Sequence, residues 1–554
     1  MASRRDELNA YTFARKRTVG AFLLPGGGGS DEDAPRPVKA VLPSIVVGTL
    51  IVSGFGLWGA FKPSAPVGWD SGKNIIQGKT STTRYVVLEK DGVKRLHQVL
   101  NMASAKLLLP VNSKVVVVAD QVLDAYPNHG PTLGIQYAPD KLPASDVAGR
   151  AMKWSVCDSP GAEDSQGAVN QTVFVAGGAD AKALEAKDRV LDIDQAVFVQ
   201  QVADTQISGQ QAAGAVKSTQ STLEYYLVDS KGRRHALGDT QTSDEQKKAL
   251  VTAVFGENAT PQRVKADWMN TLERGQAITF PQIPGVNVSV KSPNSNVKLQ
   301  KAQDQKIGRL VRFNDKNYVV GKDQLYPITA FQSALLLNNP ALQGLYDQDA
   351  DRTPKVDDIT PADQAKYGQG TVKENKLNLP VDWPTATGDP VNNWEAPKDA
   401  RKVLCSTYDG VEADGKTARR SIWVGTTAPA TYSVGSSSAH VTAGYGSFYR
   451  AVDGGADGTL DGSGSNYLIT ETGLRYAVQT NSDGGSAKQG QSASPQPTAQ
   501  PDAQQQAAAE ESGGTQARLG YKDIQPLPVP KQWSDLVPAS SALSSEAAGE
   551  QQSA

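Results

Sequence analysis

The stretch Tyr85-Val-Val-Leu-Glu-Lys-Asp-Gly92 recurs in outline as Tyr225-Tyr-Leu-Val-Asp-Ser-Lys-Gly232 and as Asn466-Tyr-Leu-Ile-Thr-Glu-Thr-Gly473. Leu310-Val-Arg-Phe-Asn-Asp-Lys-Asn317 is a looser fourth copy. Each copy has an apolar run, a polar turn ending in Gly or Asn, and a second apolar run, a pattern typical of a β-hairpin. A helical or small-residue segment follows each copy, at 104–109, 246–255, 333–337 and 540–548. The sequence therefore predicts four hairpin-and-helix repeats.

The spacers between these copies are also similar to each other. Trp154-Ser-Val-Cys157 leads to Val173-Phe-Val-Ala, as Val403-Leu-Cys405 leads to Ile422-Trp-Val-Gly. The aromatic residue of the second strand follows the Cys by 17 residues in one spacer and by 18 in the other. We infer a duplicated unit of about 200 residues, in which each half supplies part of a central β-rich domain.

The segment 40–61 contains 22 residues without a charge and lies between Lys39 and Lys62. A helix of this length spans the roughly 30 Å hydrocarbon layer of a membrane. A cleaved signal peptide is the alternative, but the charged leader and the apolar segment are both too long for one. We therefore expect one permanent transmembrane helix.

Basic residues are concentrated before this segment. Seven of the first 39 residues are Lys or Arg, which predicts a cytoplasmic N-terminus and an extracytoplasmic location for residues 62–554. Residues 6–24 show helical spacing and could dock a cytoplasmic partner or lie on anionic lipid, although an ordinary basic flank explains them equally well. The residues expected to serve membrane docking and anchoring are Arg4, Arg5, Arg15, Lys16, Arg17, Lys39, Trp58 and Lys62.

Composition excludes several classes of function. With 56 Lys and Arg against 58 Asp and Glu, the chain has no net positive field for a nucleic-acid backbone. Four His and two Cys show no metal-ligand spacing, so neither a metal nor another cofactor is expected. In an oxidising compartment, Cys157 and Cys405 are expected to form a disulfide between the two halves; two buried free thiols are the alternative.

Few residues suggest catalysis. Gly78-Lys79-Thr80 is similar to the end of a phosphate-binding loop, but Lys occupies position 73, where the motif requires Gly. Asp192 and Asp194 would share one face of a strand, and His440 follows a serine cluster at 436–438, without forming a recognised catalytic motif. We expect no enzyme activity. The alternatives are a membrane-anchored hydrolase of nucleotides or cell wall, and a receptor that binds a small molecule between the halves.

Residues 481–517 are rich in Gln, Ser, Ala, Gly and Pro, and they are expected to be disordered. The following segment, 519–533, regains apolar and aromatic residues and should dock on folded protein. Its Pro-Leu-Pro-Val-Pro core should be extended. The sequence leaves open whether the docking surface belongs to the same chain or to a neighbouring one.

The arrangement resembles the EccB family, a membrane component of the actinobacterial type VII (ESX) secretion system. The resemblance covers nearly the whole chain and rests on Ser3-Arg-Arg-Asp-Glu-Leu-Asn-Ala-Tyr-Thr-Phe13, Gly54-Phe-Gly-Leu-Trp-Gly59, the repeat at 85–109, the Cys pair and the segment 527–537. It implies an inner-membrane protein whose four repeat domains surround a disulfide-clamped central domain. It also implies self-association and assembly with EccC, EccD and EccE, in which EccC is the ATPase motor.

The expected fold class is α+β, with one N-terminal transmembrane helix followed by an elongated, internally duplicated region of four small repeats around a β-rich centre. The expected divisions are a cytoplasmic segment 1–39, the transmembrane helix 40–61, a linker 62–79, repeat 1 at 80–115, the central domain at 116–215 and 341–460, repeat 2 at 216–285, repeat 3 at 286–340, repeat 4 at 461–480 and 518–554, and the disordered insert 481–517.

Overall fold

The computed structural model describes residues 3–23, 38–61, 65–161, 169–202, 224–286, 306–322, 324–347, 349, 351–365, 379–385, 390–392, 401–430, 439–455, 458–479 and 514–552. The chain divides into two compact units. One unit comprises Met1–Trp69, Ile76–Thr82 and Val116–Pro127, and the other comprises Asp70–Ile75, Thr83–Val115 and Asn128–Ala554.

The first unit begins with two helices. Helix α1 (Arg4–Leu23) carries Asp6 and Glu7 in its first turn, where carboxylates stabilise the positive end of a helix. Helix α2 (Val38–Phe61) covers the segment expected to cross the membrane. Among the residues that the structure describes, no helix reaches the combination of length and hydropathy that defines a membrane span.

The predicted linker 62–79 is wrong in part, because it contains strand β1 (Asn74–Gly78). Ile75 and Ile76 are fully buried, so this strand has a place in a core although its sequence is short. Strand β4 (Lys114–Val118) and helix α4 (Asp120–Asp124) follow later in the chain. The amide of Lys79 donates to the carbonyl of Val118, which joins the turn after β1 to the end of β4.

The second unit contains several small sheets. Their antiparallel strand pairs include β2–β3 (Arg84–Lys90, Val93–Val99), β8–β9 (Tyr225–Val228, Arg233–Ala236), β12–β13 (Leu310–Phe313, Lys316–Val320), β13–β14 (Leu325–Ile328) and β20–β21 (Leu460–Ile469, Arg475–Ala477). Gly92, Gly232 and Gly473 adopt a positive φ in their turns, which explains why glycine ends three of the recurring strings.

A helix follows each set of antiparallel strands, and then the chain returns to the sheet. The helices are α3 (Met102–Leu108), α7 (Asp244–Phe255), α9 (Ala330–Leu337) and α12 (Thr515–Leu519). In three sheets the returning strand pairs parallel with the first strand: β10 (Gln262–Val264) with β7 (Val197–Gln201), β15 (Val356–Asp358) with β12, and β22 (Leu527–Pro530) with β19 (Ser447–Gly454). These sheets therefore share one topology.

This topology corrects the position of the loosest sequence copy. The strings at 225 and 466 join the second and third strands of their sheets, whereas Leu310–Phe313 is the first strand of its sheet. The equivalent pair is β13–β14, which contains Tyr318-Val-Val and is similar to Tyr85-Val-Val. The expected hairpin at 310–317 therefore lies one strand too early in the chain to be equivalent to the other three.

The central sheet has the strand order β17-β16-β5-β6-β18. Its strands are β5 (Lys153–Pro160), β6 (Val169–Ala176), β16 (Val403–Val411), β17 (Ala418–Gly425) and β18 (His440–Val441). The expected central segments 116–215 and 341–460 are too wide, because β7, β15 and β19 pair with strands of the smaller sheets. The recurring hairpin strings in the sequence therefore predicted only some of the strands in each small sheet.

The remaining elements are short. They are α5 (Ser145–Ala148), α6 (Gly178–Ala183), α8 (Ala266–Asn270), β11 (Glu273–Arg274), the 3₁₀ helix η3 (Pro340–Leu345), α10 (Pro361–Ala365), α13 (Lys531–Ser534) and α14 (Ser545–Ala548).

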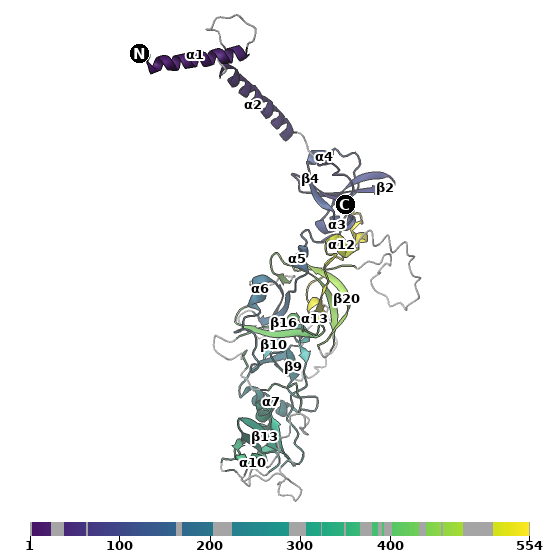
Figure 1. The fold of residues 1–554 in the computed structure, drawn as a ribbon. Helices are drawn as coiled ribbons and strands as arrows, with labels where there is room; N and C mark the ends of the chain where they lie inside the picture. The colour runs from purple at the N-terminus through teal and green to yellow at the C-terminus, as the bar shows by residue number, and fades with distance from the viewer. Residues whose placement is uncertain are drawn as a thin grey trace. The chain divides into compact units, whose positions relative to one another are not determined.

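The C-terminal segment packs on its own chain. Figure 1 shows the yellow helix α12 beside α3. Lys106 Nζ donates to the carbonyl of Leu519 at 3.1 Å, and Arg518 donates to the carbonyl of Leu107 at 2.7 Å. Helix α12 begins at Thr515, so the expected disordered insert extends too far; its residues 481–513 lie outside the described part of the chain.

Candidate functional site

The two halves of the chain meet at the middle of the central sheet. Strands β5 and β16 pair antiparallel, with Cys157 directly opposite Cys405, and a disulfide joins the two residues across 248 positions of sequence. Both cysteines are buried beside Phe174 and Trp423, the aromatic residues that the sequence spacing matched. Free thiols, the alternative, are absent at both positions of this pair.

The pairing also explains the order of the sheet. β6 follows β5 on one side, and β17 follows β16 on the other, so the two halves make matching hairpins around the disulfide. Ser155 and Thr407, on the same two strands, lie 2.9 Å apart through their hydroxyl oxygens in a fully buried position. The centre is therefore held by one covalent bond and by a satisfied polar pair.

A second duplicated motif was missed in the sequence. Val264-Lys-Ala-Asp-Trp268 and Val529-Pro-Lys-Gln-Trp533 each connect a returning strand to a one-turn helix. The two Trp side chains are almost fully buried in one core with Tyr408. A constant offset of 265 residues relates these two motifs. The same offset relates Ile278 to Leu543, which form bridges to Leu237 and Val478, the residues directly after β9 and β21. A search for Val-x-x-x-Trp would have found this signal.

The Gly78-Lys79-Thr80 turn is occupied by a carboxylate of the chain itself. Asp120 accepts hydrogen bonds from the amides of Thr80 at 2.8 Å and Ser81 at 3.2 Å, and from the Ser81 hydroxyl. These bonds, the Ser81 hydroxyl first, lower the pKa of Asp120 to about 2. The next element is strand β2 rather than the helix that opens after a phosphate loop, so the turn lacks the geometry for a nucleotide.

The other candidate residues do not converge. Asp192 and Asp194 lie in a turn before β7, which contradicts the expected strand. His440 Nε2 lies 3.5 Å from Asp180, and the serine cluster 436–438 lies outside the described residues. Within the described residues, no group of three or more His, Cys, Asp or Glu side chains could hold a metal ion.

Two histidines occupy matching positions that the sequence analysis did not connect. His97 on β3 packs over Gly130, and His235 on β9 packs over Gly275. In both cases the ring Nδ1 lies 2.9 Å from the carbonyl oxygen of the residue after the glycine. A Cβ at either glycine would meet the ring, so each histidine fastens a return segment to the last strand of its hairpin.

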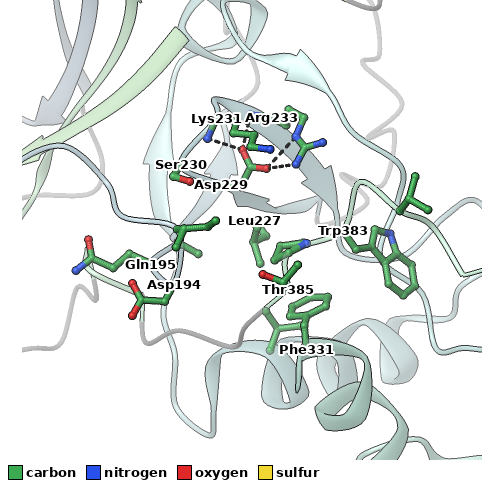
Figure 2. Close-up of a pocket in the computed structure, with 15 residues that line it drawn as sticks. Asp194, Gln195, Leu227, Asp229, Ser230, Lys231, Arg233, Phe331, Trp383 and Thr385 are labelled. Atoms are coloured by element: carbon green, nitrogen blue, oxygen red, sulfur yellow. Dashed lines mark hydrogen bonds and ion pairs between the residues drawn. The ribbon is translucent and has the colours of Figure 1, made fainter. Parts of the chain in front are cut away.

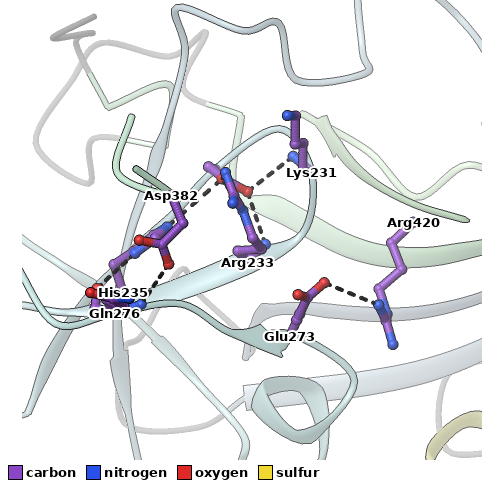
Figure 3. Close-up of polar contacts among 8 residues, drawn as sticks. Lys231, Arg233, His235, Glu273, Gln276, Asp382 and Arg420 are labelled. Atoms are coloured by element: carbon purple, nitrogen blue, oxygen red, sulfur yellow. Dashed lines mark hydrogen bonds and ion pairs between the residues drawn. The ribbon is translucent and has the colours of Figure 1, made fainter. Parts of the chain in front are cut away.

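A polar network surrounds the β8–β9 turn (Figure 3). Asp229 accepts hydrogen bonds from the amides of Lys231 and Arg233 and from the Arg233 guanidinium. Burial would raise the pKa of Asp229, but His235 and the Arg233 contacts outweigh burial and lower it. Asp382 binds the amide of Gln276 at 2.8 Å. The Asp229 carboxylate is therefore held by hydrogen bonds within the turn and is paired with the Arg233 guanidinium.

A cavity of about 140 Å³ lies beside this turn. Figure 2 shows the Asp229–Arg233 pair on one wall, Phe331 of α9 on another, and Trp383 on a third. The full lining is Ile193, Asp194, Gln195, Ala196, Leu227, Asp229, Ser230, Lys231, Arg233, Val254, Phe331, Val381, Trp383, Pro384 and Thr385. The lining contains both apolar and charged side chains, without a recognised nucleophile–base pair among these residues.

The positions assigned to membrane docking are placed only in part. Arg4, Arg5, Arg15, Lys16 and Arg17 lie exposed on α1. Lys39 and Trp58 lie within α2, and Lys62 lies outside the described residues. Exposed apolar residues accompany the charges on α1, namely Leu8, Tyr11, Phe13, Val19, Phe22 and Leu23.

These features define a multi-sheet α+β protein in which a central disulfide joins the two halves of the chain. The whole chain, residues 1–554, matches the family model described as type VII secretion system ESX-1, transport TM domain B. The chain belongs to the EccB family.

Relatives of known sequence support this assignment. The chain is 25% identical over 493 residues to the ESX-3 secretion system ATPase EccB3 of Mycolicibacterium smegmatis. The aligned region covers 86% of this chain and 83% of the relative. It is 26% identical over 335 residues to the ESX-1 secretion system ATPase EccB1 of Mycobacterium tuberculosis, and this aligned region covers 60% of each chain.

Solved structures show the same fold. A chain of the periplasmic assembly from the ESX-5 inner membrane complex matches with a TM-score of 0.56 and 18% identity, over 88% of this chain and 98% of that chain. The EccB3 dimer from the ESX-3 core complex matches with a TM-score of 0.56 and 20% identity, over 86% of this chain and all (100%) of that chain.

Proposed function

We propose that this protein is a structural, non-enzymatic subunit of a type VII (ESX) secretion complex. It associates with further copies of itself and with EccC, EccD and EccE. Family membership supports a place in such a complex, because relatives of similar fold occur in a dimer and in an intact inner membrane complex. The occupied Gly78-Lys79-Thr80 turn supports a non-enzymatic role.

In the topology that we propose, α2 crosses the inner membrane once. The N-terminus and α1 are cytoplasmic, while the sheets and the disulfide lie outside. The basic residues that precede α2 and the oxidised Cys157–Cys405 pair both favour this orientation. Lys39, Trp58 and Lys62 would then lie near the two surfaces of the bilayer.

We also propose that the four hairpins mark four repeats around the central sheet. The shared return of β10, β15 and β22 beside the first strands of their sheets supports this division. The recurrence of the strand string and of α3 in the first repeat agrees with it. Val197 of β7 and Tyr449 of β19 are buried in one cluster with Val156 of the central sheet, so packing against the centre stabilises these two repeats.

ATP hydrolysis is the alternative that a specific observation favours, because the relatives carry the word ATPase in their names. In this chain, however, the amides that would contact a phosphate already donate to Asp120. A bound phosphate would have to displace a carboxylate that these bonds hold ionised. The scaffold role therefore fits the geometry better.

The observation that carries the docking part of this proposal is the surface of α1. None of its side chains is buried, yet it displays six large apolar residues beside its basic cluster. Exposed apolar groups on a helix are stabilised when a partner covers them. We infer that α1 docks on the cytoplasmic part of the other membrane components.

Replacing three of these residues tests the docking role. The variant Leu8→Ser, Tyr11→Ser and Phe22→Ser should reduce recovery of EccC, EccD and EccE with the tagged chain by about tenfold, since burial of each side chain contributes roughly 1.5–3 kcal/mol. The matched control is Asn9→Ser, Thr12→Ser and Thr18→Ser on the same helix. Equal recovery with both variants would contradict docking through α1.

A further inference from the structure

A tight turn follows helix α2 within a few residues. The Trp69 amide donates to the carbonyl of Pro66 at 3.2 Å, and Gly68 has a positive φ of 73°. A positive φ at the third residue is characteristic of a type II turn, so Val67 is the second residue and lies at the tip. Val67 is fully exposed. The chain therefore presents an apolar side chain where Pro, Asn, Asp and Ser usually dominate.

An aromatic pair joins this turn to the rest of the first compact unit. The rings of Trp69 and Tyr126 meet edge to face, with centroids 5.5 Å apart and an angle of 73° between their planes. Both residues are half-buried. Trp and Tyr concentrate at the two surfaces of a membrane, because each ring is apolar and carries one polar group. The turn therefore ends on residues that are typical of a membrane interface.

Strand β4 adds a second exposed valine to the same unit. Val118, the last residue of β4, is fully buried, whereas Val117 is 51% exposed. Strand β10 also borders the first strand of its sheet, and it also ends with an exposed residue followed by a buried one. In β10 the exposed residue is Arg263, a side chain that water solvates well. Valine at this place in β4 would be stabilised by an apolar neighbour.

The helix proposed to cross the membrane ends close to these residues along the chain. Helix α2 ends at Phe61, and Val67 follows it by six residues. Six residues reach at most about 22 Å when fully extended, so Val67 stays near the outer surface of a bilayer that α2 crosses. Val117 and Tyr126 belong to the same compact unit as α2 and the turn. A lipid surface is therefore an apolar neighbour that the chain itself brings within reach.

We propose that Val67, Trp69, Val117 and Tyr126 form a surface that contacts the outer face of the membrane. The two valines enter the boundary between headgroups and acyl chains, and the aromatic pair lies at the level of the headgroups. The contact rests on the proposed topology of α2 and adds to it. A single helix anchors the chain, whereas a second contact with the membrane also restricts the orientation of the first sheet.

A fluorophore on an introduced cysteine tests the contact. The chain has two cysteines, and both are in the disulfide, so an introduced cysteine is the one reactive thiol of the native protein. The variants Val67→Cys and Val117→Cys of the full chain are labelled with the dye NBD. They are then reconstituted in nanodiscs of phosphatidylethanolamine and phosphatidylglycerol, with or without a nitroxide on the lipid headgroup. We expect the nitroxide to remove most of the fluorescence at both positions, because it quenches NBD at short range.

Two further positions calibrate the measurement. Val47 is exposed on α2, and a label at Val47→Cys should be quenched by a nitroxide on the acyl chain when α2 inserts. Val381 is 91% exposed, lies in the other compact unit and follows Val67 by more than 300 residues. A label at Val381→Cys should keep its fluorescence with either nitroxide lipid.

A charge distinguishes an apolar contact from simple proximity to the membrane. In the chain labelled at Val67→Cys, the additional change Val117→Asp should shift the equilibrium away from the docked state by about fivefold or more, because an aspartate is not stabilised among acyl chains. Quenching of the label should fall accordingly. The matched control is Val93→Asp, at an exposed valine outside the first compact unit. Circular dichroism checks that both variants keep the fold.

The possible results separate this contact from the topology on which it rests. Quenching at Val47, with full fluorescence at Val67 or Val117, would overturn the contact and leave the topology intact. No quenching at Val47 would contradict both. Equal quenching of the Val67→Cys label with and without Val117→Asp would show that the two valines do not share one membrane contact.

Discussion

Asp158 is a buried carboxyl next to the central disulfide. It accepts hydrogen bonds from the Lys265 amide at 2.7 Å and from Gln171 at 2.9 Å, and so connects β5 to the segment before α8. Burial raises its pKa to about 7, and the two hydrogen bonds reduce that shift without cancelling it. The residue therefore changes charge near neutral pH.

The sign of the resulting pH dependence follows from the proton balance. Between pH 4 and pH 7 the folded state holds a proton on Asp158 that the unfolded state has released, so this group makes the protein less stable as pH rises. In Asp158→Asn this contribution is absent. We expect the melting temperature of the variant to fall less than that of the parent chain between pH 5 and pH 8. The corresponding difference in the free energy of unfolding is a few kcal/mol, at about 1.4 kcal/mol per pKa unit.

Differential scanning fluorimetry across this pH range measures the effect. Asp146→Asn is the control, because Asp146 is an exposed carboxyl on α5. Identical pH profiles for the parent chain and Asp158→Asn would show that Asp158 does not hold its proton in the folded protein.

Residues of this kind are difficult to recognise from sequence. The two cysteines could be paired because each is the single Cys of its half. Arg309, by contrast, reads as an ordinary surface residue but is fully buried between Asp349 at 2.9 Å and Asp357 at 2.7 Å, beneath the ring of Tyr346. Its partners follow it by 40 and 48 residues, so only the fold reveals the cluster.

At the scale of elements, the returning segments were the least predictable part of the fold. Strand β10 has only three residues, and a strand so short has no periodicity to detect. The antiparallel hairpins were easier to predict because strong apolar runs flank their glycine turns. Parallel pairing of β22 with β19 joins residues about 80 positions apart, a distance over which local patterns carry no information.

The motif that ends each return segment makes a testable prediction. Trp533 on α13 is 1% exposed, and its indole N–H donates to the carbonyl of Ser406 at 3.4 Å, so the side chain attaches the C-terminal segment to the central sheet. Trp533→Ala should reduce the free energy of unfolding by about 3–5 kcal/mol. Trp268→Ala should cost a similar amount.

Chemical denaturation of the purified chain measures these losses. Gln532→Ala and Asp267→Ala are matched controls, because both residues are exposed and immediately precede the two tryptophans. A loss below about 1 kcal/mol in Trp533→Ala would mean that the C-terminal segment is not fixed to the sheet through this side chain.

At the scale of the whole molecule, the disulfide joins segments that are otherwise distant along the chain. The Cys157–Cys405 bond closes a loop of 248 residues, and loop closure of this size contributes about 5 kcal/mol on a chain-entropy estimate. Replacing both residues with Ser should lower the melting temperature and make it insensitive to dithiothreitol. The parent chain should lose stability when reduced.

Thiol labelling provides an independent measurement of the same bond. The native parent chain should take up no maleimide until it is denatured and reduced, and each single Ser variant should expose one reactive thiol after denaturation alone. Labelling of both cysteines in the native, oxidised chain would contradict a structural disulfide.

The packing of the C-terminal segment against α3 affects the order in which the chain folds. The core beneath α3 contains Ala103 and Leu107 together with Leu519, Leu543 and Ala548, so its first and last members are separated by more than 400 residues. Contacts of such long range form late, because the intervening chain must first be arranged. During synthesis, the earliest repeat therefore stays incomplete until almost the last residue has emerged, and a chain shortened by a premature stop would expose α3 to proteases.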